Sequence, residues 1–72
     1  MLRRRGIRLE WMEEALASPQ RVERDVTDPS IVHHLRTIDA NEGRVLRVLY
    51  NEAVSPVRIV SVFLDRRMKG KL

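Results

Sequence analysis

Arginine and tyrosine side chains interleave with aliphatic residues in the C-terminal half of the chain. Arg47 and Tyr50 lie within one aliphatic run, and Arg66 and Arg67 follow directly after the next. Guanidinium groups bind phosphate through paired hydrogen bonds, and they stabilise the charge that builds on phosphoryl oxygens during RNA cleavage. A phenol such as Tyr50, or an imidazole such as His34, can transfer the proton of a ribose hydroxyl. These residue types therefore suggest binding of RNA, or its cleavage without a metal.

Catalysis and structure are both open interpretations of these residues. The candidate catalytic residues are Arg47, Tyr50, Arg67 and His34, and the candidate nucleic-acid contacts are Arg47, Arg66, Arg67 and Lys69. Tyr50 could equally be a core aromatic with its hydroxyl at the rim, and His34 a half-buried strand residue. Arg47 lies mid-strand between apolar residues and needs a partner, either the carboxylate of Asp65 or Glu23, or a phosphate.

No metal site and no cofactor are predicted. The only two histidines, His33 and His34, are adjacent, and neighbouring residues of a strand point to opposite faces, so the pair is unsuited to a shared metal ion. Cysteine is absent, which excludes disulfides and thiolate zinc sites. The sequence also lacks a P-loop, a dinucleotide-binding fingerprint and a Ser-His-Asp arrangement.

Composition predicts one small basic domain over residues 1–72. Lysine and arginine number 14 against 10 aspartates and glutamates, a net charge of +4. Such a charge fits RNA, the ribosome or an acidic protein as a partner, although a solvated basic surface is the alternative. No apolar run approaches the roughly 20 residues of a membrane span, so no membrane association is expected. The cysteine-free composition fits the cytoplasm.

The hydrophobic pattern predicts one helix followed by three or four antiparallel strands, an α+β class with the helix packed on the sheet. A helical stripe of Leu9, Met12 and Leu16 indicates a helix over residues 7–17, which Ser18-Pro19 ends. Residues 20–26 alternate as an exposed or edge strand. Residues 31–39 favour a strand, with a short helix as the alternative.

The two strongest predicted strands are residues 44–50 and 57–65. A hairpin loop over residues 40–43 precedes the first, with Gly43 suited to a positive φ. Both faces of 44–50 are partly apolar, which favours a central strand. In 57–65 the alternation puts one set of side chains on each face: Val60, Val62 and Leu64 on one, and Ile59, Ser61 and Phe63 on the other.

Two stretches of sequence resemble known families. RRGIRLEWMEEALASPQRV resembles the opening of a widespread prokaryotic family of small domains of unknown function, and NEGRVLRVLYNEAVSPVRIVSVFLDRR resembles its L-R-V-V-like strand and D-R-R ending. The same ending is similar to RelE/ParE-like toxins, including the BrnT group. Arg47 and Tyr50 match the central-strand motif of those toxins, and Arg66 or Arg67 matches their terminal arginine. Both groups generally carry a further segment before the helix, whereas this chain begins almost at the helix.

The toxin resemblance implies a helix on an antiparallel sheet and a neutralising antitoxin. In RelE-like members it also implies ribosome-associated mRNA cleavage. The function expected from the sequence is therefore a toxin-like protein of a toxin–antitoxin pair that acts on RNA or translation, with an acidic antitoxin as a partner. The alternative is a non-enzymatic protein-interaction module, including a homodimer formed through an edge strand.

Overall fold

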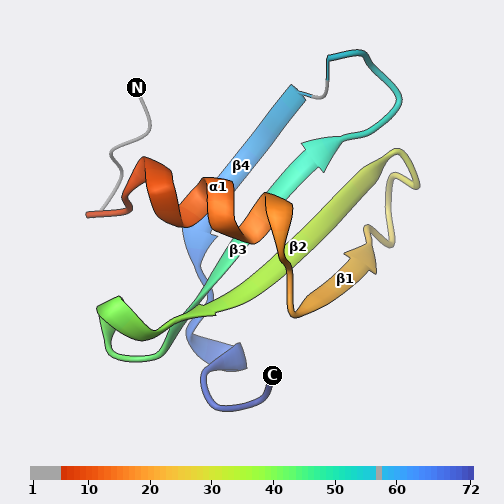
Figure 1. Ribbon diagram of the computed structural model, residues 1–72. Coiled ribbons are helices and arrows are strands. Elements are labelled where there is room, and N and C mark those ends of the chain that lie inside the picture. Colours follow the sequence, from red (N-terminus) through yellow and green to blue (C-terminus); the bar gives the residue numbers. More distant parts are fainter. Residues whose placement is uncertain (1–5, 57) are drawn as a thin grey trace.

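In the computed structural model, which describes residues 6–56 and 58–72, one α-helix packs across a four-stranded antiparallel sheet (Figure 1). The elements are α1 (Leu9–Ala17), β1 (Arg21–Arg24), β2 (Ile31–Ile38), β3 (Arg44–Asn51) and β4 (Arg58–Leu64), with single-turn 3-10 helices η1 (Asp39–Asn41) and η2 (Arg66–Met68). The expected class, α+β with a helix on the sheet, is confirmed. The expectations for the basic residues 1–5, and for Val57 as the first residue of a strand, lie outside the described residues.

The strands follow one another across the sheet in the order β1-β2-β3-β4. β3 is central, as its two partly apolar faces predict, and β1 is an edge strand. Residues 31–38 pair as a strand along their whole length and do not form the alternative helix. The predicted hairpin before β3 contains η1, and Glu42 and Gly43 turn the chain with φ values of 60° and 73°.

The helix packs through a different stripe from the predicted one. Met12 and Ala15 are buried, with Trp11 and Leu16 partly buried beside them. Leu9, expected in the stripe, is 54% exposed, so that prediction is wrong. Ile7, which precedes the helix, is buried in the core cluster, and the helix itself begins only at Leu9. The residue before the first turn therefore supplies the apolar contact expected from Leu9.

A β-bulge changes the predicted faces at the start of β4. The register with β3 shifts between Leu49 and Tyr50, so that Tyr50 lies opposite Ile59 and Leu49 lies opposite Ser61. Ile59 packs against the core beneath the helix, whereas Val60 is exposed. The prediction that paired Val60 with Val62 is therefore wrong, because the extra residue of a bulge interrupts strict alternation.

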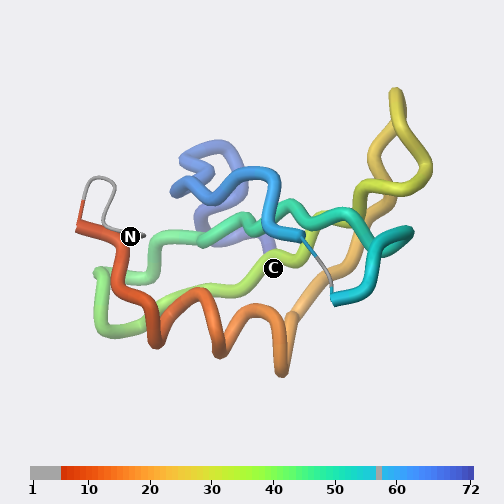
Figure 2. The backbone as a smooth tube through the Cα atoms, turned by 90° about the horizontal axis from the view of Figure 1, so that it is seen from above, coloured from red at the N-terminus to blue at the C-terminus, as the bar shows by residue number. Residues whose placement is uncertain are grey.

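The two faces of the sheet are covered by different parts of the chain. The helix lies on one face, here called the helix side, and the C-terminal segment lies on the other, the tail side (Figure 2). Leu46 and Val48 are buried on the helix side with Met12. Leu35 and Val45 have the opposite parity and are also fully buried, and η2 contacts β3. A 72-residue chain thus buries apolar side chains on both faces of its sheet.

Candidate functional site

The four candidate catalytic residues are divided between the two faces of the sheet. Arg47 Nε donates to Asp65 Oδ2 across 2.9 Å, and the backbone N–H of Arg67 donates to Asp65 Oδ1, which places both arginines on the tail side. His34 Nδ1 lies 3.2 Å from the carbonyl oxygen of Ala15 in α1, which places His34 and its partner Tyr50 on the helix side. The structure therefore separates the two guanidiniums from the proton-transfer candidates by the thickness of the sheet.

Arg47 is the centre of a polar cluster on the tail side, here called the tail-side network. Besides Asp65, its Nη1 lies 2.7 Å from His33 Nδ1 and 3.4 Å from Glu23 Oε1. The expectation that Arg47 needs a partner such as Asp65 or Glu23 is confirmed for both carboxylates. The side chains of Arg47 and Asp65 are only 12% and 4% exposed. Arg47 is thus a largely buried guanidinium whose Nε and Nη1 both have partners.

His33 completes the network and is held in one tautomer. An arginine side chain can only donate hydrogen bonds, so His33 Nδ1 accepts from Arg47 and the ring proton lies on Nε2. That proton is donated to Asp25 Oδ1, 2.8 Å away. Hydrogen bonds to the Asp25 carboxylate from the backbone of Asp28, then from His33 and the backbone of Thr27, lower the pKa of Asp25 below its ordinary value. With both ring nitrogens engaged, His33 holds the network together and is not a free base.

His34 and Tyr50 form a second polar pair under the helix. The Ala15 carbonyl can only accept, so His34 Nδ1 donates to it, and His34 Nε2 accepts from the Tyr50 hydroxyl at 3.2 Å. The two rings also meet edge to face, with centroids 4.9 Å apart. Arg36 of the same strand donates to the carbonyl oxygen of Ser18, just past the helix end. These contacts hold the C-terminal end of α1 on the sheet.

Sequence reasoning did not assign His33 to the network or His34 to the helix end. The signal for His33 was present in part, because His33 and Arg47 lie on adjacent strands. Their common face, however, depends on the β2–β3 register, in which Leu35 lies opposite Arg47. The contact of His34 with Ala15 depends on where the helix crosses the sheet.

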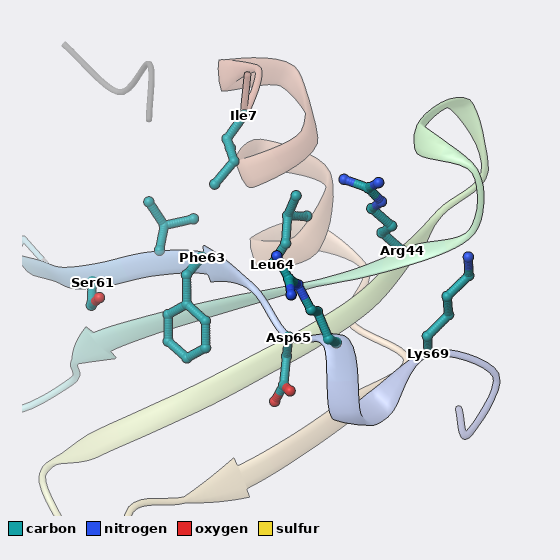
Figure 3. Close-up of a pocket in the computed structure, with 9 residues that line it drawn as sticks. Ile7, Arg44, Ser61, Phe63, Leu64, Asp65 and Lys69 are labelled. Carbon is teal, nitrogen blue, oxygen red and sulfur yellow. The ribbon is translucent and has the colours of Figure 1, made fainter. Parts of the chain in front are cut away.

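Four exposed cations lie close to where β3 begins and β4 ends. Arg44, Arg66, Arg67 and Lys69 are all exposed and are here called the cationic surface. Asp65 caps η2 through the backbone N–H of Arg67, so the turn projects Arg66 and Arg67 from the end of β4. Arg44 and Lys69 lie at the same end of a hollow of about 700 Å³ that runs beside β4 (Figure 3). Two predicted nucleic-acid contacts, Arg66 and Lys69, line this hollow, whereas Arg67, which is also in η2, is not among its lining residues.

Among residues 6–56 and 58–72, no three acidic or imidazole side chains are placed to hold one ion. No helix in those ranges has the length and apolar character needed to span a bilayer. Searches of family models, curated proteins and solved structures found no match to this chain.

Proposed function

We propose that this protein binds RNA through the cationic surface, as a toxin-like protein that acts on RNA or on translation. The observation that carries the proposal concerns Asp65, the carboxylate adjacent to Arg66 in sequence, which is already bound to Arg47. Asp65 is buried against Arg47, and its Oδ1 lies 3.8 Å from Arg67 Nε, beyond hydrogen-bond distance. The side chain of Arg67 is 91% exposed. Guanidiniums left to solvent in this way can each take a phosphate group.

Within this proposal Arg47 positions the binding residues and does not touch RNA. It holds Asp65, Asp65 caps η2, and η2 carries Arg66 and Arg67. RNA contacts would come from Arg44, Arg66, Arg67 and Lys69, which reach solvent at one end of the sheet. This differs from the expectation from sequence, in which Arg47 itself meets the phosphate.

The proposed activity is binding, because the division of the candidate residues does not favour cleavage. A metal-independent mechanism needs a guanidinium and a proton-transfer group at the same phosphodiester. Arg67 lies on the tail side, whereas Tyr50 and His34 are hydrogen-bonded to each other beneath the helix. Toxin-like interference with translation through RNA binding requires no such alignment.

RNA binding is tested by fluorescence anisotropy with a short, labelled single-stranded RNA over a range of salt concentrations. Phosphate contacts release counterions, so affinity should fall steeply with salt, and each contact removed should lower the slope by about 0.7. The Arg66→Ala, Arg67→Ala double variant should bind more weakly and with a shallower slope. The Arg21→Ala, Arg24→Ala double variant removes the same charge from β1 at the far edge and should bind like the wild type. No binding at low salt, or equal loss in both variants, contradicts the proposal.

The toxin-like action is tested separately by induced expression in a bacterial host. Growth arrest with a change in total RNA or in protein synthesis is the expected result. Normal growth, with RNA binding intact in vitro, removes the toxin-like role and leaves RNA binding alone.

A second candidate function, a non-enzymatic protein-interaction module, is favoured by one specific observation. β4 is an edge strand of seven residues, and Val60 and Phe63 on it are exposed. An edge of this length with apolar side chains is a template for pairing with another chain.

A further inference from the structure

The two edges of the sheet differ in how well they are protected. β1 has only four residues, and its charged side chains are tied up locally: Arg21 pairs with Glu23, and Arg24 pairs with Glu52. β4 is nearly twice as long and carries no charge between Arg58 and its end at Leu64. Short strands and charges discourage edge pairing, so β1 is the blunted edge and β4 is the open one.

The hydrogen-bond ladder shows which groups β4 offers. The backbone N–H of Asp65 donates to the carbonyl oxygen of Val45 in β3. Residues of an antiparallel strand alternate between pointing toward one neighbour and toward the other. Phe63 therefore faces β3 with its backbone, in line with Asp65, while the N–H and C=O groups of Val62 and Leu64 point to the outer edge.

The hollow beside β4 follows that edge. Its lining includes every residue from Ser61 to Arg66. Phe63 and Asp65 extend to one side of the strand and Leu64 to the other, toward Ile7 (Figure 3). A cavity on a sheet face would be lined by alternate residues, so a hollow lined by consecutive residues lies along the strand edge itself. A hollow along a strand edge suits an extended peptide that pairs with that strand.

The charge around this hollow determines which charge a bound segment should carry. Arg44, Arg66 and Lys69 line it and are exposed. Asp65, the one carboxylate among the described residues of the lining, is buried and bound to Arg47. An extended segment with acidic side chains would therefore be attracted, whereas a basic one would be repelled.

We propose that β4 accepts an extended, acidic segment of another protein as a fifth strand of the sheet. Backbone hydrogen bonds to Val62 and Leu64 would hold the segment, and its carboxylates would lie against Arg66 and Lys69. This partner goes beyond RNA binding and would compete with RNA for those two cations. A second copy of this chain is disfavoured, because antiparallel β4 strands would place Arg58 of one copy near Arg66 and Lys69 of the other.

The test measures binding of a synthetic peptide of alternating glutamate and valine, followed by anisotropy of a terminal dye. Its controls are the same peptide with alternate backbone nitrogens methylated, which abolishes strand pairing but keeps the charge, and a lysine–valine peptide. The acidic peptide should bind about tenfold or more tightly than either control. Equal binding of the methylated peptide would show attraction by charge alone and overturn the proposal.

Amide hydrogen exchange locates the bound strand. The N–H groups of Val62 and Leu64 should gain protection when the acidic peptide is added, and those of β1 should not. Binding should weaken about tenfold in the Arg66→Ala, Lys69→Ala variant at low salt, and not in Arg21→Ala, Arg24→Ala. Sedimentation showing a dimer of the free protein, with Val62 and Leu64 already protected, would make a second copy the occupant and overturn the proposal.

The peptide and RNA experiments fail independently. RNA binding without any peptide binding rejects the fifth strand and keeps the proposed function. Peptide binding with protection at Val62 and Leu64, in a protein that does not bind RNA at any salt concentration, rejects the proposed function and keeps the fifth strand.

Discussion

Arg47 Nη1 and His33 Nδ1 lie 2.7 Å apart across the β2–β3 pair, with the guanidinium as the donor. The contact requires a neutral imidazole with its proton on Nε2, and Asp25 accepts that proton's hydrogen bond. An acidic side chain of the β1–β2 connection is thereby joined to the centre of the sheet. Arg47 also donates a hydrogen bond to Asp65, the residue that follows β4.

Removing Arg47 should destabilise the protein strongly. Arg47→Leu leaves the nearly buried carboxylate of Asp65 without its cation, and breaking a buried ion pair from one side costs about 3–5 kcal/mol. Urea denaturation should show a midpoint well below that of the wild type. Arg21→Ala, at an exposed pair, should cost less than about 1 kcal/mol. Equal midpoints for the two variants would mean that the tail-side network does not hold Asp65.

Asp25→Asn should give a stability difference that depends on pH. The pKa of Asp25 is lowered in the folded state from its ordinary value of 3.8, so the folded protein favours the carboxylate. Its contribution is present above pH 3.8 and is lost as the pH falls through the lower folded pKa. Thermal melts of the two proteins should therefore differ near neutrality and converge in acid. A constant difference across this range would rule out the Asp25 carboxylate as its source.

Leu46→Ala should lower the free energy of unfolding by about 2–5 kcal/mol, because the Leu46 side chain of β3 is fully buried in the core beneath the helix. The matched control is Val60→Ala on β4, where the side chain is exposed and the expected change is small. Chemical denaturation measures both. A Leu46→Ala midpoint equal to that of the wild type would place Leu46 outside the core.

Tyr50→Phe separates structure from RNA binding. The substitution keeps the ring against His34 and removes only the hydroxyl that donates to His34 Nε2, a loss of about 0.5–1.5 kcal/mol. RNA affinity should be unchanged, because Tyr50 lies on the helix side, away from Arg67. A lower melting temperature with wild-type RNA affinity is expected. Weaker RNA binding at an unchanged melting temperature would show that Tyr50 belongs to the RNA-binding site.

The strands and the central position of β3 were predictable because their signals are local. Alternation along residues 44–50 indicates which side chains face each layer, whereas residues 31–39 also allowed a short helix, and pairing with β3 decides for the strand. The bulge at Ile59 and Val60 was not predictable in the same way, because it depends on how β4 fits β3. The prediction that Leu9 is buried was wrong for a related reason: Ile7, which lies outside the helical repeat, occupies the core instead.

The candidate site was predictable residue by residue but not as an arrangement. An arginine between apolar neighbours signals a need for an anionic partner, and both suggested carboxylates meet Arg47. Whether Tyr50 and Arg67 share a face depends on the turn after β4, where Asp65 fixes the direction of η2. Three-dimensional register, and not residue type, decides which of these groups can act together.

The shared carboxylate of Asp65 has a consequence for cooperativity. Its two oxygens bind the β3 arginine and the backbone of η2, while the same arginine leads through His33 to Asp25. The C-terminal turn and the β1–β2 connection are far apart in sequence, yet they belong to one chain of contacts. They should therefore open together as a single unit in native-state hydrogen exchange. A substitution that breaks a contact at either end should speed amide exchange at both ends.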